Sequence, residues 1–167
     1  EAFIGRSNVK STEEAALKAT KLIFENIEKV YEDGKNIEAR ENMLVASFYA
    51  GVAFTRAYVG YVHAIAHNLG GMYGIPHGLA NAVLLPFVLE AYGKSAEKKL
   101  AKLAYHIHLV SEITPQEDAA KAFIQMIKDM KKKLNIGDTI EGIKEEDIKK
   151  LSKYADKEAN PLYPVPK

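Results

Sequence analysis

An all-α fold is predicted by three features of the sequence. Apolar residues recur at helical spacing in several stretches, and Gly, Pro, Asp or Asn separates these stretches. No stretch shows the sustained apolar–polar alternation that is typical of a half-buried strand. The chain has 167 residues, 47% of them hydrophobic, which is enough for one core. Residues 1–167 are therefore predicted to form a single multi-helix domain.

Capping residues bound the helices expected in the first part of the chain. Ser11 and Glu14 fit a capping box, and apolar residues follow at positions 16, 19, 23, 27 and 30. Asp33-Gly34 is expected to end this helix, and Asn36 is the expected N-cap of the next. The second helix starts polar but is apolar on every side from Met43 onward. This pattern predicts that it enters the middle of the helical body.

The remaining helices are predicted from the same periodicity. Gly70-Gly71 should end the third helix, Thr114-Pro115 should begin the sixth, and Pro86 is expected as a kink or boundary within the fourth. The expected ranges are 61–69, 78–92, 95–109, 115–133 and 145–154. Residues 160–167 contain three prolines and are predicted to be an extended tail with no obvious packing partner.

Composition excludes several classes of protein. The net charge is +1, from 23 basic and 22 acidic residues, so there is no electrostatic footprint for nucleic acid or an anionic membrane. The chain has no cysteine, which rules out disulfides and thiolate metal sites and fits a cytoplasmic protein. The long uncharged run from Ala57 to Leu89 is interrupted by three His, five Gly and two Pro, which favours a buried core over a bilayer span.

The stretch from Gly51 to Pro86 is the candidate functional region. It holds three of the five histidines but only one charged residue, Arg56, in a chain that is 27% charged. This depletion predicts that the stretch is buried. Buried imidazoles need partners, and burial favours the neutral form, which is the form that binds metal. The other two histidines, His106 and His108, are two residues apart on an amphipathic helix and are interpreted as surface or boundary residues.

Spacing alone leaves two interpretations of the three histidines open. His63 and His67 are four residues apart on one helical face, a spacing that can hold a metal, although such pairs are more often packed or hydrogen-bonded. His77 follows a glycine-rich loop and can fold back over that face. The stretch contains no Asp or Glu, so an anionic ligand would have to come from elsewhere. The alternative is a self-contained helical metal-binding or interaction module with structural histidines.

The residues around these histidines form a longer and more specific pattern. It reads AGxAFxxAxxGxxHAxAHxLG from Ala50 to Gly70 and GIPHGxxxAxxLP from Gly74 to Pro86. With this pattern the whole chain resembles the C-terminal helical domain of the iron-containing (group III) alcohol dehydrogenases. The resemblance implies an enzyme that interconverts an alcohol and an aldehyde or ketone by hydride transfer to or from NAD or NADP. A divalent metal would act as Lewis acid, with iron(II) the usual metal and zinc also suited to the ligands.

The resemblance also assigns roles to individual residues. His63 and His77 match two metal ligands of the family. His67 matches a histidine that is not a ligand but lies near the metal and the nicotinamide, where it is implicated in substrate positioning and proton relay. Phe54 and Val59 match positions near the substrate pocket.

The family's other two ligands imply residues upstream of this chain. They are an aspartate and, four residues later, a histidine, in a helix that reads on as His-Ala-Ile-Glu-Ala. Because this chain starts Glu1-Ala2, the resemblance implies that both ligands and an N-terminal nucleotide-binding domain precede it. The chain is thus expected to be a domain fragment, inactive by itself and weak in metal affinity. The missing domain would hold most of the coenzyme, and a homodimer is compatible with the family.

Overall fold

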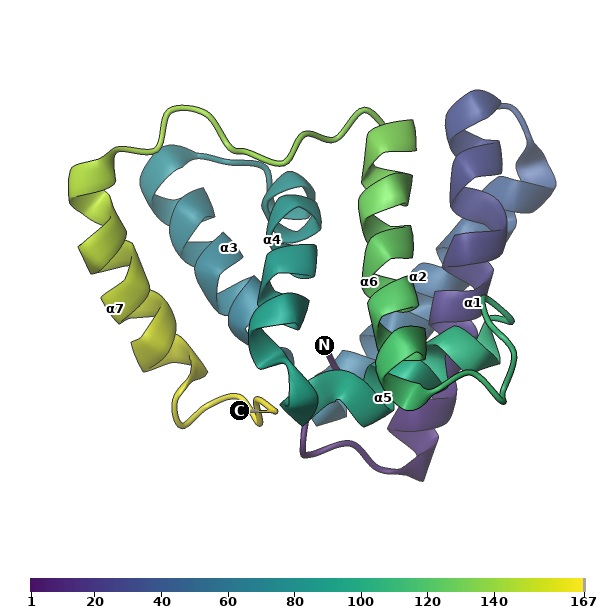
Figure 1. Ribbon diagram of the computed structural model, residues 1–167. Helices are drawn as coiled ribbons and strands as arrows, with labels where there is room; N and C mark the ends of the chain where they lie inside the picture. Colours follow the sequence, from purple (N-terminus) through teal and green to yellow (C-terminus); the bar gives the residue numbers. More distant parts are fainter. Residues whose placement is uncertain (167) are drawn as a thin grey trace.

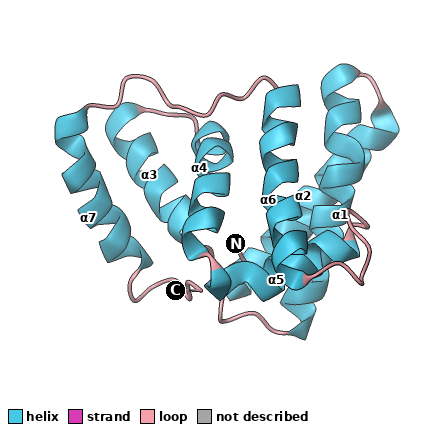
Figure 2. Ribbon diagram, in the orientation of Figure 1, coloured by secondary structure: helices cyan, strands magenta, loops and turns pink. Residues whose placement is uncertain are grey.

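The computed structural model describes residues 1–166, and within them it contains α-helices and no strand (Figure 2). The predicted all-α class is confirmed. The helices are, in chain order, α1 (Lys10–Glu32), α2 (Ile37–Ala57), α3 (Tyr61–Tyr73), α4 (His77–Tyr92), α5 (Lys94–His106), α6 (Gln116–Lys133) and α7 (Ile148–Ala159), with a 3-10 turn η1 at Glu145–Asp147.

The helices pack mainly on their neighbours in space. Helices α7, α3, α4 and α6 stand in a row, each in contact with the next, while α5 packs on α6 and crosses beneath it (Figure 1). Helices α1 and α2 form a long antiparallel hairpin on the far side of α6. Glu13 of α1 pairs with Lys99 and Lys102 of α5 and so ties this hairpin to the rest of the fold. The row places α3 and α4, which carry the candidate histidines, side by side.

The core joins both ends of the described chain to the helices. Leu100, Val62 and Val165 are among the most deeply buried side chains, and Phe3 is also buried. The backbone amide of Arg6 donates to the carbonyl of Pro164 at 2.8 Å. The expectation that residues 160–167 have no packing partner is therefore wrong, because an extended tail can still insert alternate side chains into a core. Lys167, the last residue of that tail, lies outside the described residues.

Three helix boundaries differ from the sequence prediction. Helix α1 is capped by Val9 and Thr12, whose hydroxyl accepts from the Val9 amide at 2.8 Å, and not by a Ser11–Glu14 box. Helix α3 continues through both expected stop glycines and ends at Gly74, whose φ of 67° suits glycine. Proline occupies the N-cap position of α6, so Thr114 lies one residue outside it.

Other boundaries match the prediction or differ from it by one to five residues. The Asn36 side chain accepts from the Ala39 amide at 3.0 Å, which confirms it as the N-cap of α2. Helix α4 begins at His77, one residue earlier than expected, and Pro86 lies inside it without ending it. Helix α7 begins after η1 and extends to Ala159, five residues past the predicted end.

One side of α2 is exposed, contrary to the prediction that the helix is surrounded. Leu44, Phe48 and Val52 lie at successive helical turns and are 73%, 68% and 45% exposed. The buried residues of the helix are all alanines, at positions 39, 46, 53 and 57, and this narrow small-residue face packs against its neighbours. The uncharged run from residue 43 to residue 55 predicts burial, but among residues 1–166 nothing covers this apolar stripe.

A sharp break separates α2 from α3. Tyr58 has a φ of 64°, and the two helices meet at an angle of 103°. Among residues 1–166 no single helix is long and apolar enough to cross a membrane; α2 and α3 pass that test only when counted as this bent pair. Gly60 is the N-cap residue of α3, and its Cα faces the Glu1 carboxylate and the Tyr92 hydroxyl.

Two glycines in this region should respond to alanine in opposite ways. A Cβ at Gly60 would lie 2.8 Å from Oε1 of Glu1 and 3.1 Å from the Tyr92 hydroxyl, so Gly60→Ala should destabilise the chain by about 1–3 kcal/mol. A Cβ at Gly51, inside α2, would meet nothing within 4 Å, so Gly51→Ala should stabilise by about 0.5–1 kcal/mol. Urea unfolding followed by circular dichroism measures both. Equal effects of the two substitutions would contradict the prediction.

Candidate functional site

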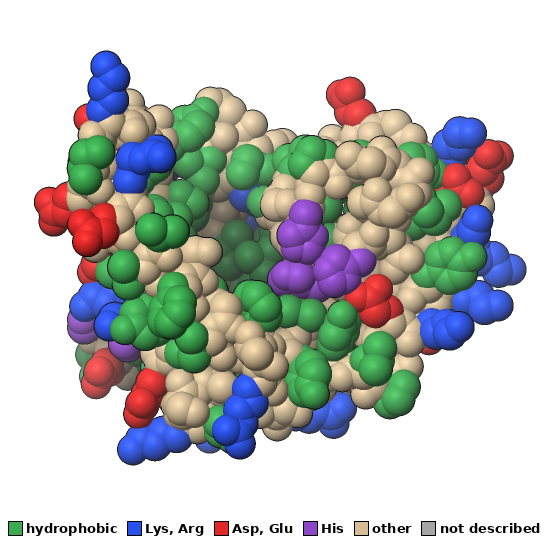
Figure 3. All heavy atoms as spheres, turned by 180° about the vertical axis from the view of Figure 1, so that it is seen from behind, with side chains coloured by type: hydrophobic (Ala, Val, Ile, Leu, Met, Phe, Trp, Pro, Cys, Tyr) green, Lys and Arg blue, Asp and Glu red, His purple; other side chains and the backbone are tan. Residues whose placement is uncertain are grey.

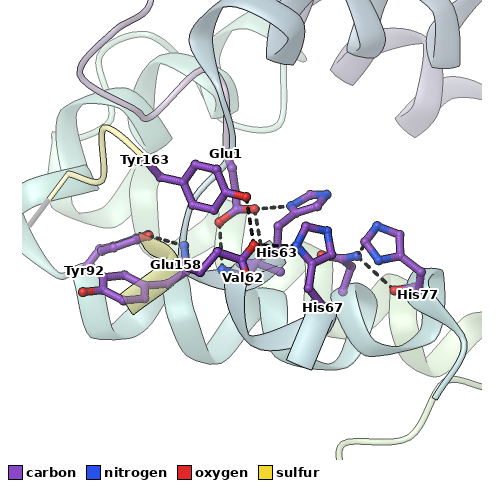
Figure 4. A network of polar contacts seen from close by, with 10 residues as sticks. Glu1, Val62, His63, His67, His77, Tyr92, Glu158 and Tyr163 are labelled. Atoms are coloured by element: carbon purple, nitrogen blue, oxygen red, sulfur yellow. Dashed lines mark hydrogen bonds and ion pairs between the residues drawn. The ribbon is translucent and has the colours of Figure 1, made fainter. Parts of the chain in front are cut away.

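The three histidines of the Gly51–Pro86 stretch lie together. His63 and His67 project from one face of α3, and His77 is the first residue of α4 (Figure 4). The ring centroid of His63 is 5.8 Å from that of His67 and 5.3 Å from that of His77. The rings of His67 and His77 stack at 5.3 Å with an interplanar angle of 15°. The turn between α3 and α4 therefore folds His77 back over the face of α3, as the sequence predicted.

The cluster is at the surface, so the predicted burial of this stretch is wrong at its centre. The His63 and His67 side chains are 28% and 43% exposed, and His77 is exposed as well. Figure 3 shows the three imidazoles at the rim of a hollow with a hydrophobic floor. The residues between the histidines, Ala64 and Ala66, are the ones that face the core. A stretch without charged residues can therefore still lie at the surface of the described part of the chain.

Glu1 holds His63. One of its carboxylate oxygens contacts Nδ1 of His63, and the carboxylate accepts from the backbone amides of Val62 at 2.8 Å and His63 at 3.2 Å (Figure 4). It therefore caps the N-terminus of α3, where the helix dipole favours an anion. Burial alone would raise the pKa of the Glu1 carboxyl, but the bond from His63 and the Val62 amide together hold that pKa below its usual value. When the ring is neutral and donates Nδ1–H to Glu1, Nε2 of His63 carries the lone pair.

His67 is held by a second carboxylate. Its Nδ1 lies 2.6 Å from Oε1 of Glu158, in the last turn of α7, and the Tyr163 hydroxyl donates to the same oxygen at 2.9 Å (Figure 4). The Glu158 side chain is 25% exposed. Each of these two imidazoles therefore has its own carboxylate partner on Nδ1.

His77 is held by an amide. Nδ2 of Asn81, one turn further along α4, lies 3.0 Å from Nε2 of His77 and donates to its backbone carbonyl at 2.9 Å. Oδ1 of Asn81 is buried and has no hydrogen-bond partner among the described residues. Desolvation, and then the neighbouring His63 and His67, hold the pKa of His77 below its usual value. The ring thus favours the neutral form that metal binding requires.

The donor set fits part of a metal site. Among residues 1–166, no three His, Asp or Glu side chains are placed so that they could hold a metal ion together. The cluster nevertheless offers imidazoles on two converging helices, and the Glu1–His63 pair has the carboxylate–histidine arrangement that commonly backs a metal ligand. His63 and His77 therefore fit as two ligands that need others to complete a site.

The residues matched to the substrate pocket lie at the bend between α2 and α3. Phe54 is in the last turn of α2 and is 47% exposed, and Val59 is half-buried in the break itself. Neither lines the two grooves found between α1 and α6 and among α4, α5 and α6. His106 is half-buried and His108 exposed, both far along the chain from the cluster, as their interpretation as boundary and surface residues requires.

Glu158, Tyr163 and Asn81 were not singled out from the sequence. Glu158 and His67 are 91 residues apart, so no local spacing connects them. Asn81 could have been found, because it follows His77 by one helical turn and can reach its ring. Glu1 was noted for its motif, but its capping of α3 depends on a contact across 61 residues.

Two tyrosines beside the site should ionise unusually late. Desolvation raises the pKa of Tyr92 to about 12, and desolvation with the hydrogen bond to Glu158 raises that of Tyr163 to about 12. Their neutral forms are favoured by the fold, so their contribution to stability is complete below about pH 10, the unfolded pKa. It is lost as the pH rises from there towards 12. Tyrosinate absorbance should show a late step that shrinks in Tyr92→Phe and Tyr163→Phe; one step near pH 10 would contradict this.

Comparison with known proteins is consistent across sequence and structure. Residues 1–165 match the family described as "Fe-containing alcohol dehydrogenase family, C-terminal". Alcohol dehydrogenase 4 of Saccharomyces cerevisiae is 40% identical over 157 residues, which is 93% of this chain and 40% of the yeast protein. The 1,3-propanediol dehydrogenase of Citrobacter freundii is 38% identical over 162 residues, 96% of this chain and 42% of that protein.

A solved structure of a 1,3-propanediol oxidoreductase superimposes with a TM-score of 0.94 at 37% identity, covering 100% of this chain and 44% of that one. The chain thus spans about two fifths of the length of these relatives. The match runs through every helix and through both histidine-bearing segments. This chain belongs to the Fe-containing alcohol dehydrogenase family and corresponds to its C-terminal helical domain.

Proposed function

We propose that this chain is the metal-binding part of an NAD(P)-dependent alcohol dehydrogenase that interconverts an alcohol and an aldehyde or ketone. The observation that carries the proposal is the convergence of His63, His67 and His77 at one surface of a chain of this family. The relatives named above are alcohol and propanediol dehydrogenases, which supports small alcohols and aldehydes as the substrate class.

His63 and His77 would hold a divalent metal, iron(II) by family resemblance, with zinc also suited to imidazole ligands. When bound, the metal would supply Lewis-acid polarisation of the substrate oxygen. Glu1 keeps the Nδ1 proton of His63 and thereby leaves Nε2 as the donor atom. The remaining ligands would come from other parts of the longer protein, as the two-histidine geometry requires.

His67 would act on the substrate proton. Its ring lies beside those of both His63 and His77, and Glu158 accepts at its Nδ1, so Nε2 of the neutral ring is the nitrogen that can accept the hydroxyl proton of an alcohol. Phe54 and Val59 would supply apolar contact to the carbon chain of the substrate at the α2–α3 bend.

The rest of the longer protein is the expected partner of the exposed face. A nucleotide-binding domain would hold most of NAD or NADP and would approach the surface on which the histidines lie. The apolar stripe of α2, formed by Leu44, Phe48 and Val52, is suited to burial by additional protein. Homodimer formation and a cytoplasmic location stay predictions.

The test is reduction of NAD and of NADP by the full-length protein in the presence of simple alcohols, with the reverse reaction measured on the matching aldehydes. Activity that requires iron(II) or zinc supports the proposal. A metal-loaded protein that is inactive with every coenzyme–alcohol pair would refute it. It would instead favour a helical module in which carboxylate-paired histidines are structural, an alternative suggested by the contacts of Glu1 and Glu158.

The chain of 167 residues by itself should bind metal weakly and catalyse nothing, because it offers two of the proposed ligands and no coenzyme domain. Calorimetric titration with zinc should give at most a weak isotherm, with a dissociation constant at least about a hundredfold above that of the full-length protein. A tight one-to-one site that is lost in His63→Ala and His77→Ala would overturn this prediction.

A further inference from the structure

The carboxylate of Glu158 receives two hydrogen bonds on one oxygen. Nδ1 of His67 lies 2.6 Å from Oε1, and the hydroxyl of Tyr163 donates to the same atom at 2.9 Å. An ionised carboxylate can only accept, so His67 must donate from Nδ1. In the neutral ring the other nitrogen, Nε2, then carries the lone pair. Figure 4 shows His67 between this carboxylate and His77, with the His63 ring beside it.

We propose that Glu158 is a positioning residue for His67: it fixes the Nδ1–H tautomer and the ring orientation, so that Nε2 is presented to the histidine cluster as a proton acceptor. Tyr163 aligns the carboxylate from the C-terminal tail. The inference rests on the proposed function, in which His67 takes the alcohol proton. It adds the segment α7 and its tail, which spacing did not connect to the histidines, to the machinery of the site.

A merely structural role for Glu158 fits the packing less well. Helix α7 is docked by Leu151, Ala155 and Ala159, which are all buried. Its C-terminal end is also held through a separate polar contact, in which Asn160 donates to the hydroxyl of Tyr61 at 2.7 Å. Anchoring of α7 to α3 therefore does not need Glu158, whereas the half-exposed His67 ring has no hydrogen-bond partner other than Glu158 among the described residues.

Two substitutions of nearly equal size test whether the hydrogen-bond acceptor at position 158 is what matters. Glu158→Gln keeps an oxygen that can accept from Nδ1–H, while Glu158→Met keeps the length and helix propensity of the side chain but has no strong acceptor. Lys157→Ala, at an exposed position beside Glu158 in α7, is the matched control. Folding of each variant is checked by circular dichroism and thermal unfolding.

The primary readout is the tautomer of His67, measured by ¹⁵N–¹H correlation of imidazole signals in the zinc-loaded full-length protein. Spectra are taken at about pH 8.5, two units above the ordinary imidazole pKa of about 6.5. The His67 signals are assigned by their loss in His67→Asn. The native protein and Glu158→Gln should show the Nδ1–H form, and Glu158→Met should shift towards Nε2–H. An Nε2–H form in the native protein, or no change in Glu158→Met, overturns the inference.

The second readout is steady-state kinetics. Glu158→Met should lower kcat by about tenfold to a hundredfold, part of the roughly 10²–10⁴ that general base catalysis contributes, with the KM for coenzyme unchanged. Glu158→Gln should recover most of the rate, and Lys157→Ala should keep all of it. Full activity in Glu158→Met would refute the positioning role while leaving the dehydrogenase intact. An inactive native protein with the expected tautomer would instead refute the proposed function and leave the His67–Glu158 pairing standing.

Discussion

In the full-length protein, His63→Ala and His77→Ala should each remove the bound metal and lower alcohol oxidation by more than about a hundredfold. Removing a residue that hydrogen-bonds to a metal ligand lowers metal affinity or activity by up to about a hundredfold. Removing the ligand itself should lower them further. Metal content is measured by elemental mass spectrometry and activity by the initial rate of NAD(P)H formation. His108→Ala, an exposed histidine between α5 and α6, is the control and should keep both. Metal retained in His63→Ala would contradict the assignment.

His67→Ala should separate metal binding from proton transfer. It should keep the metal but lose most of the rate, because His67 is proposed as the relay and not as a ligand. The geometry alone does not select the ligand pair, since the His77 ring centroid is 5.3 Å from those of both His63 and His67. The family pattern selects His63 and His77. Loss of metal in His67→Ala would instead favour the pair that the i, i+4 spacing suggested.

The sequence predicted the helices well because their signals are local. Asn36 caps α2 through a bond to a residue three positions away, and His77 begins α4 at a Pro-preceded turn. Such signals can be recognised from the sequence alone, because the interacting residues are close together in the chain. The α1 start was misplaced because Val9 and Thr12 form a cap that competes with the Ser11–Glu14 pattern, and both are locally acceptable.

Long-range features could not be predicted in the same way. Glu158 reaches His67, and Glu1 reaches His63, only after α3 has docked on α7 and on the N-terminal segment. The exposure of α2 was missed for a different reason. Hydropathy indicates which helix surface lacks charged residues. It does not indicate whether this stretch of chain contains the residues that would cover that surface. Leu44 and Phe48 are as apolar as core residues and yet exposed.

The second large effect is expected at Glu1, because one buried carboxylate serves both the fold and the site. Its side chain is 5% exposed and accepts hydrogen bonds from two α3 amides and from the His63 ring. Glu1→Ala leaves these donors without their anion at a position that is itself buried. The free energy of unfolding should fall by about 1–3 kcal/mol, the usual cost of leaving buried hydrogen-bond donors without their acceptor. Urea unfolding of the purified chain measures it.

Glu14→Ala is the matched control, since Glu14 is 67% exposed and only loosely paired with Lys10, at 4.0 Å. It should change stability by less than about 0.5 kcal/mol. In the full-length protein Glu1→Gln, which keeps the size of the side chain, should weaken metal binding by about tenfold to a hundredfold, because His63 loses the anion that fixes its Nδ1 proton. If Glu1→Ala unfolded like Glu14→Ala, the carboxylate would not cap α3. If Glu1→Gln bound metal like the native protein, His63 would not need it as a partner.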